Sequence, residues 1–214
     1  MKAYVITIMD NDESCRVANR CIESGKRFGV DVEIFAAVTP ADNPLRMAKD
    51  WGIPVDGFQE KYSRLENCVA AFLSHYTLWK LCDGDNVPYT IFEHDAILKD
   101  NIPMFSSFSH VMNIGRPSYG RFNTPVLLGV NPLTSKPYMP GAHAYMIKPS
   151  GAKALMEKAK TVAGPTDVFM NLKNFPWMEE YYPWPAEAHD SFTTIQKTEG
   201  CLAKHNYNGK YKII

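Results

Sequence analysis

A short apolar run that ends in three polar side chains carries the strongest chemical signal in this sequence. Residues 89–92 are followed at once by Glu93, His94 and Asp95. A buried strand that ends in carboxylates places negative charge at the carboxyl end of a sheet, where open α/β sheets bind ligands. Two such carboxylates suit a hard divalent cation, which can in turn bind a diphosphate. The alternative is a polar strand end whose carboxylates are simply solvated.

The charge around this strand end also favours a cation. Residues 83–100 include five acids and one lysine, although the whole chain is neutral, with 23 basic and 23 acidic residues. A diphosphate would be repelled unless a cation came with it. Because side chains alternate along a strand, Glu93 and Asp95 are predicted to point one way and His94 the other.

The remaining sequence predicts the elements that would position this site. Strands are expected at residues 2–8, 32–38, 89–92, 110–114, 125–130 and 142–147. Longer helices are expected at 14–27, from 63 to about 81, and at 148–160. Ser14 is expected to cap the first, and Ser63 and Glu66 have the spacing of a capping box at the start of the second. Short helices are expected near 45–51 and from 165. Strands and helices alternate in the first half, which favours an α/β fold with helices on both faces of a sheet.

Length and composition are those of an ordinary globular protein. The 214 residues suggest one domain, and 45% are hydrophobic and 21% charged. The apolar runs are too short for a transmembrane helix, and the first residues do not resemble a signal peptide. The five cysteines are odd in number and include no C-x-x-C pair, which argues against a disulfide framework or a structural zinc site. We therefore expect a cytoplasmic protein with reduced thiols.

Several common functional classes lack their sequence motifs here. There is no dinucleotide-binding glycine fingerprint, P-loop, zinc-protease motif or nucleophile elbow. Zero net charge also gives no overall electrostatic footprint for nucleic acid, although a local basic groove remains compatible with it.

A series of short motifs runs along most of the chain. Residues 70–80 read Ala-Ala-Phe-Leu-Ser-His-Tyr-Thr-Leu-Trp-Lys and precede the Phe-Glu-His-Asp-Ala of the strand end. An opening strand followed by Ser14 and Arg16, and Phe-Ala-Ala-Val at 35–38, come before them. A glycine-led block at 141–155 and Pro-Thr-Asp at 165–167 come after them. In order and spacing these motifs resemble glycosyltransferase family 25, the lipooligosaccharide-type and collagen-type sugar transferases.

Three motifs depart from the pattern of that family. His94 stands where the family has the middle Asp of Glu-Asp-Asp, Ala70 and Ala71 replace Gly-Cys, and the opening Asn-Leu is Thr-Ile at 7–8. The first two of these departures leave open a non-catalytic module that binds a nucleotide sugar or a glycan.

The resemblance implies a single-domain GT-A-type nucleotide-sugar transferase fold with a Rossmann-like N-terminal half. Residues 1–100 would form the nucleotide-sugar-binding half and 101–196 the acceptor and catalytic half, with 197–214 as a tail. Together they would form one glycosyltransferase domain over residues 1–214.

The chemistry implied is a metal-dependent, inverting transfer of a hexosyl or pentosyl group from a nucleotide-diphosphate sugar to a hydroxyl acceptor, with a glycan as first choice. Asp95 and Glu93 would hold Mn²⁺ or Mg²⁺. His189, or else His205, would complete the metal shell, and an imidazole ligand favours Mn²⁺.

Inversion requires a base that takes the proton from the attacking hydroxyl. Asp167 is the first candidate and Asp190 the second. The residues expected to contact the donor are Arg16, Val38, His75, Glu93 and His143. Structural alternatives remain open: His75 as a core histidine, Arg16 as a surface residue, and Asp167 as an ordinary acid in the first turn of a helix.

A second acceptor class is a hydroxylated or hydroxymethylated base in DNA. Such an enzyme needs a basic groove and usually extrudes its target base. The tail lysines Lys197, Lys204, Lys210 and Lys212 would supply part of that groove.

Overall fold

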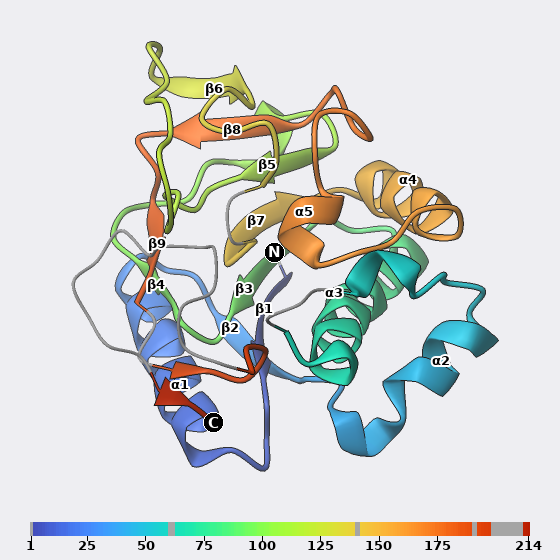
Figure 1. Cartoon of the computed structure of the whole chain (residues 1–214). Coiled ribbons are helices and arrows are strands. Elements are labelled where there is room, and N and C mark those ends of the chain that lie inside the picture. The colour runs from blue at the N-terminus through green and yellow to red at the C-terminus, as the bar shows by residue number, and fades with distance from the viewer. Residues whose placement is uncertain (1, 60–62, 140–141, 190–191, 198–211) are drawn as a thin grey trace.

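The computed structural model describes residues 2–59, 63–139, 142–189, 192–197 and 212–214. Its centre is a mixed seven-stranded sheet (Figure 1). In spatial order the strands are β2 (Val32–Ala36), β1 (Lys2–Thr7), β3 (Tyr89–Glu93), β7 (Ala144–Ile147), β5 (Val111–Asn113), β8 (Glu179–Tyr182) and β6 (Gly129–Pro132). β1 pairs in parallel with β2 and β3, whereas β7 runs antiparallel to both β3 and β5.

Helices cover both faces of this sheet, as Figure 1 shows. α1 (Asp12–Arg27) packs on one face, and α3 (Leu65–Asp85) and α4 (Pro149–Ala159) pack on the other. Ile91 of β3 belongs to the core beside α3, and its neighbour Phe92 belongs to the core beside α1. The predicted α/β class is therefore confirmed, because adjacent strand residues bury themselves in two separate helix-covered cores.

The remaining elements are short. In the described part of the chain, two further helices are α2 (Pro44–Asp50) and α5 (Thr166–Phe169). Three 3-10 turns there are η1 (Pro40–Asp42), η2 (Asp56–Phe58) and η3 (Phe105–Ser107). Two small sheets pair β4 (Ala96–Leu98) with β9 (Ala186–Ala188) and β10 (Phe192–Thr193) with β11 (Lys212–Ile213). No helix in the described ranges is long and apolar enough to cross a membrane.

The chain turns immediately after β3, which corrects the predicted alternation. Glu93 is the last strand residue, and His94 and Asp95 form a turn that leads into β4. Glu93 keeps the alternation and shares the α3 side of the sheet with Ile91. The alternation does not extend to His94 and Asp95, because a turn has no two-residue period.

Both predicted helix caps are wrong. α1 begins after Asn11, whose side chain accepts the backbone N–H of Ser14 at 2.9 Å. α3 has Arg64 at its N-cap and no side-chain cap, whereas Ser63 forms an isolated β-bridge with Gln196. At α1, Asn11 takes the cap position that local spacing assigned to Ser14. At α3, Ser63 pairs with the distant Gln196 instead of capping the helix.

The strand predicted at 125–130 lies further along the chain. β6 covers Gly129–Pro132, where the backbone pairs with β8. Val126, Leu127 and Leu128 precede it and are 94%, 68% and 78% exposed. The apolar run indicated a strand, but only the part beside β8 finds a partner.

An aromatic cluster anchors α3 against the rest of its core. The fully buried ring of Phe72 meets the rings of Trp79, Phe169 and Phe58 edge-on, with centroids 5.3–5.6 Å apart. We expect Phe72→Ala to lower the free energy of unfolding by about 3–5 kcal/mol, because a cavity replaces these contacts. Urea unfolding measures the loss. The exposed Val126→Ala variant serves as the control and should change stability by less than about 0.5 kcal/mol.

Candidate active site

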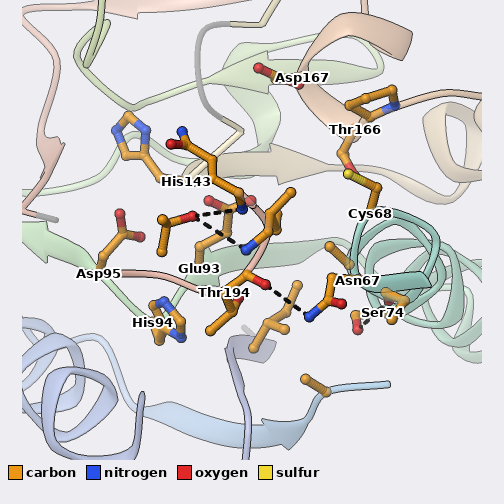
Figure 2. A pocket seen from close by; sticks show the side chains of 18 of the residues that line it. Asn67, Cys68, Ser74, Glu93, His94, Asp95, His143, Thr166, Asp167 and Thr194 are labelled. Atoms are coloured by element: carbon orange, nitrogen blue, oxygen red, sulfur yellow. Dashed lines mark hydrogen bonds between the residues drawn. The ribbon is translucent and has the colours of Figure 1, made fainter. Parts of the chain in front are cut away.

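A cavity of about 1080 Å³ opens at the carboxyl ends of β1, β2 and β3. Figure 2 shows part of its lining, with Glu93 near the centre and Asp95 and His94 to one side. Six of the nine predicted site residues line it: Val38, His75, Glu93, Asp95, His143 and Asp167. The strand-end position predicted for the site is therefore where the structure places a cavity.

The Leu-Ser-His motif on α3 connects two strands. The Ser74 hydroxyl accepts the backbone N–H of Val38 at 2.9 Å and donates to the Ala70 carbonyl at 3.0 Å. The bond from Val38 fixes the chain just beyond β2. The next residue, His75, contacts β3 through Glu93, with 3.2 Å between Nε2 and Oε1. The motif therefore holds two strand ends at the cavity.

Glu93 is the end of a buried hydrogen-bonded chain. Trp79 donates its indole N–H to the Tyr145 hydroxyl at 2.8 Å, and that hydroxyl lies 3.0 Å from His75 Nδ1. Burial lowers the pKa of His75 to about 3, although the charge of Asp167 acts in the opposite direction. The ring is therefore neutral at pH 7. Because Nε2 must donate to the Glu93 carboxylate, Nδ1 is left to accept the Tyr145 hydroxyl proton.

Removal of the central hydroxyl should break this chain. We expect Tyr145→Phe to lower the free energy of unfolding by about 1–3 kcal/mol, since Trp79 and His75 would each keep a buried polar atom without a partner. The control is Tyr76→Phe on α3, beside His75, because the Tyr76 hydroxyl forms no hydrogen bond within the described residues. Equal stability losses for the two variants in urea unfolding would contradict this account.

The turn after β3 is held from α1. His94 Nδ1 lies 2.8 Å from the Ser14 hydroxyl, which also accepts the backbone N–H of Ile8 at 2.9 Å. Arg20 donates to the carbonyl oxygens of Asp95 and His189, at 3.3 and 3.1 Å. Sequence reasoning missed Arg20, since a basic residue inside a helix gives no sign of this contact. Side-chain hydrogen bonds from α1 therefore hold the turn that carries Asp95.

The donor atoms at this turn suit a hard cation with few protein ligands. Glu93 and Asp95 line the same cavity, and Mg²⁺ or Mn²⁺ is commonly held by one or two carboxylates together with substrate phosphates and water. Within the residues that the structure describes, no group of three or more His, Cys, Asp and Glu side chains is arranged to hold a metal. A cation held by this carboxylate pair would therefore need its other ligands from a diphosphate and water.

His189 is not brought to the cavity wall. Its Nε2 lies 2.6 Å from Glu187 Oε1, and its side chain is 48% exposed. Burial opposes ionisation of Glu187, but hydrogen bonds from Lys99 and His189 leave its pKa below the usual range. The metal role of His189 stays a prediction, and Asp190 and His205 lie outside the described residues.

Arg16 is also placed away from the cavity. Its guanidinium pairs with Glu13 one turn earlier on α1, at 2.6 Å, and its side chain is 59% exposed. This placement agrees with the surface interpretation of Arg16 rather than with a diphosphate clamp.

Asp167 lies at the upper edge of the cavity in Figure 2, at the start of α5. Its Oδ2 accepts the Tyr119 hydroxyl at 2.6 Å, and its Oδ1 accepts the Val168 N–H at 2.9 Å. Burial and the Asp167 charge raise the pKa of Tyr119, so the phenol keeps its proton and donates it. Two donors therefore orient a half-buried carboxylate that faces the cavity.

His143 is buried, immediately precedes β7 and packs against Gly115. A side-chain carbon at Gly115 would stand 2.4 Å from His143 Nε2. A glycine at position 115, just after β5, is therefore needed for the His143 ring to lie where it does.

Part of the cavity wall was not predicted. The segment at the end of β10 and just after it crosses this wall (Figure 2). Asn67 donates to the Thr194 carbonyl at 2.8 Å, and the Thr193 hydroxyl accepts the backbone N–H groups of residues 195 and 196. Tyr119, Arg121 and Lys136 line it as well. Their positions depend on loops between strands, for which the sequence has no periodic signal.

The basic groove for DNA stays an untested prediction. Lys204 and Lys210 lie outside the described residues, as does the side chain of Lys212, and Lys197 is exposed.

Comparison with known proteins identifies the class. The sequence model of glycosyltransferase family 25, described as an LPS biosynthesis protein, matches residues 1–116. This chain belongs to that family, because the match spans more than half of its 214 residues. The membership indicates a glycosyltransferase and implies a nucleotide-sugar donor and a glycan acceptor.

No curated protein matches the chain. One solved structure that resembles it is the CTP:phosphocholine cytidylyltransferase from Streptococcus pneumoniae, at 12% identity and a TM-score of 0.38, with 88% of this chain and 92% of that chain covered.

Proposed function

We propose that this protein is a metal-dependent, inverting glycosyltransferase with a GT-A-type fold. It transfers a hexosyl or pentosyl group from a nucleotide-diphosphate sugar to a glycan hydroxyl. The observation that carries the proposal is one cavity at the carboxyl ends of three parallel strands, lined by the Glu93 and Asp95 carboxylates and by Asp167. Family membership supports the reaction class.

The donor diphosphate would lie at the β3 end of the cavity. Asp95 and Glu93 would hold Mn²⁺ or Mg²⁺ there, and the cation would neutralise charge on the departing diphosphate. His75 fixes the Glu93 carboxylate from α3, and Arg20 fixes the backbone of Asp95 from α1. These contacts hold the Glu93 carboxylate and the Asp95 backbone in place before the donor arrives, which reduces the cost of ordering this turn on binding.

The acceptor would lie between the donor sugar and α5. Asp167 takes the proton from the attacking hydroxyl, since its carboxylate faces the cavity and is oriented by Tyr119. Asp190 remains the second candidate for the base. His143 and Val38 are proposed donor contacts, because both line the same cavity.

We further propose that residues 1–214 form one glycosyltransferase domain. β7, β5, β8 and β6, from the proposed acceptor half, extend the same sheet as β1–β3. His143 and Asp167 of that half share a cavity with residues of the first half, which supports a single catalytic unit.

A donor panel tests the proposal. Nucleotide-diphosphate sugars that differ in base and sugar are incubated with the protein and Mn²⁺, and release of free sugar is measured. We expect hydrolysis of one donor above the others and its loss in EDTA. Equal hydrolysis in Mn²⁺ and in EDTA would contradict metal dependence, and no turnover with or without glycan acceptors would favour a binding module.

The acceptor class has its own test. Binding to duplex DNA is measured from low to moderate salt. We expect no binding even at low salt, in keeping with a glycan acceptor. Tight binding that falls steeply as salt rises would favour a DNA acceptor, because contacts to phosphates release counterions.

A further inference from the structure

A basic pocket adjoins the proposed active site. It has a volume of about 690 Å³ and shares Gly120, Arg121 and Lys136 with the main cavity. Arg116 adds a third cation, and none of the described residues that line this pocket is acidic. The surrounding sequence has the same bias, because residues 101–156 contain five Lys and Arg residues and no Asp or Glu.

The cations of this pocket have no carboxylate partners among the residues that the structure describes. Within the described part of the chain, Arg116, Arg121 and Lys136 form no ion pair. Lys136 is only 7% exposed, and its amine bonds the Tyr119 carbonyl and lies 4.2 Å from the centre of the Tyr119 ring. Burial of a cation without an anion is unfavourable. An anionic ligand would relieve that cost.

The pocket is built by specific contacts. The carboxylate of Glu180 is fully buried and accepts the backbone N–H groups of Thr134 and Ser135, at 2.6 and 2.8 Å. These bonds fix the chain immediately before Lys136. Gly120 has a φ of 65°, which side-chain-bearing residues rarely adopt, and it turns the chain between Tyr119 and Arg121.

Tyr119 joins this pocket to the proposed base. Its ring and carbonyl contact Lys136, and its hydroxyl donates to Asp167. One side chain therefore separates the basic pocket from the carboxylate that would activate the acceptor hydroxyl. A sugar whose hydroxyl reaches Asp167 would place a neighbouring substituent close to Lys136 and Arg121.

We infer that this pocket binds an anionic group on the acceptor, so that the acceptor is a glycan with a carboxylate or phosphate next to the attacking sugar. The inference rests on the proposed function. The donor diphosphate is assigned to the other side of the cavity, where Glu93 and Asp95 suit its cation. The arginines and the lysine are thus left for the acceptor.

Sugar binding tests this inference without turnover. Glucose, glucuronate and glucose 6-phosphate are titrated into the protein and followed by ligand-observed NMR. We expect at least one anionic sugar to bind about tenfold or more tightly than glucose, and the two anionic arms distinguish carboxylate from phosphate. The double variant Arg116→Gln, Arg121→Gln should lose this preference. The control Arg46→Gln, on an exposed arginine of α2 that pairs with Asp50, should keep it.

Three results would overturn the inference. The first is equal binding of all three sugars by the wild type, and the second is an anionic preference that survives in the double variant. The third is a raised KM for the donor in that variant with an unaltered KM for the acceptor, which would assign the arginines to the donor diphosphate. Failure of the proposed function is distinguishable, because it appears as absent donor hydrolysis in the wild type while the sugar titrations are still readable.

Discussion

Replacement of Asp167 by Asn is expected to lower the rate of sugar transfer by about 10²–10⁴-fold, the usual contribution of a general base. Asparagine keeps the size of the side chain and can still accept a hydrogen bond from the Tyr119 hydroxyl. In the wild type this hydroxyl lies 2.6 Å from Asp167 Oδ2. It cannot take a proton from the acceptor. The loss should therefore fall on kcat, with donor affinity little changed. Initial rates of transfer and donor titration measure the two quantities separately.

The matched control is Asp12→Asn. Asp12 is an exposed acid in the first turn of α1, so it reproduces the helix-dipole role that is the structural alternative for Asp167. If Asp167→Asn retained transfer within a few-fold of the wild type, Asp167 would be an ordinary first-turn acid. The base would then have to be sought elsewhere, with Asp190 as the next candidate.

The second large effect is expected at Asp95. We expect Asp95→Asn to weaken Mn²⁺-dependent donor binding by more than about 100-fold, since loss of an outer-shell partner alone costs 10–100-fold in metal affinity. Asparagine preserves the side-chain shape and removes the charge that attracts the cation. Calorimetric titration of the preferred nucleotide diphosphate, in Mn²⁺ and then in EDTA, measures the change. In the variant the two titrations should agree.

Asp10→Asn provides the control for Asp95→Asn. Asp10 is another acid that lines the cavity, beyond the end of β1. It should retain the difference between Mn²⁺ and EDTA, because it lies outside the Glu93–Asp95 turn. A similar loss in both variants would indicate that general negative charge, rather than a specific ligand, controls donor binding.

The sequence predicted the elements that carry strong periodic or apolar patterns. β1, β3, α3 and α4 lie within a few residues of their expected ranges. The cavity was expected at the end of β3 because a buried strand that stops at Glu93 must deliver polar groups to a sheet edge. His75 was identified by resemblance alone, and its contact with Glu93 gives that motif a physical role.

What the sequence did not predict depends on contacts between distant segments. Ser14 was assigned a capping role, but it bonds His94, 80 residues away. Arg16 was assigned to the donor, yet its guanidinium pairs with Glu13 on the helix surface. Lys136 had no local signal at all, because its position beside Tyr119 depends on two loops that only the folded sheet brings together.

The central claim is that the cavity at the ends of β1, β2 and β3 binds a nucleotide-diphosphate sugar through a cation at Asp95. It is tested most directly by a crystal structure with Mn²⁺ and the nucleotide diphosphate of the preferred donor, with manganese located by anomalous scattering. We predict a manganese peak beside the Asp95 carboxylate with the diphosphate bound to it in this cavity. Nucleotide bound elsewhere on the chain, or a manganese site away from both Asp95 and Glu93, would contradict the claim.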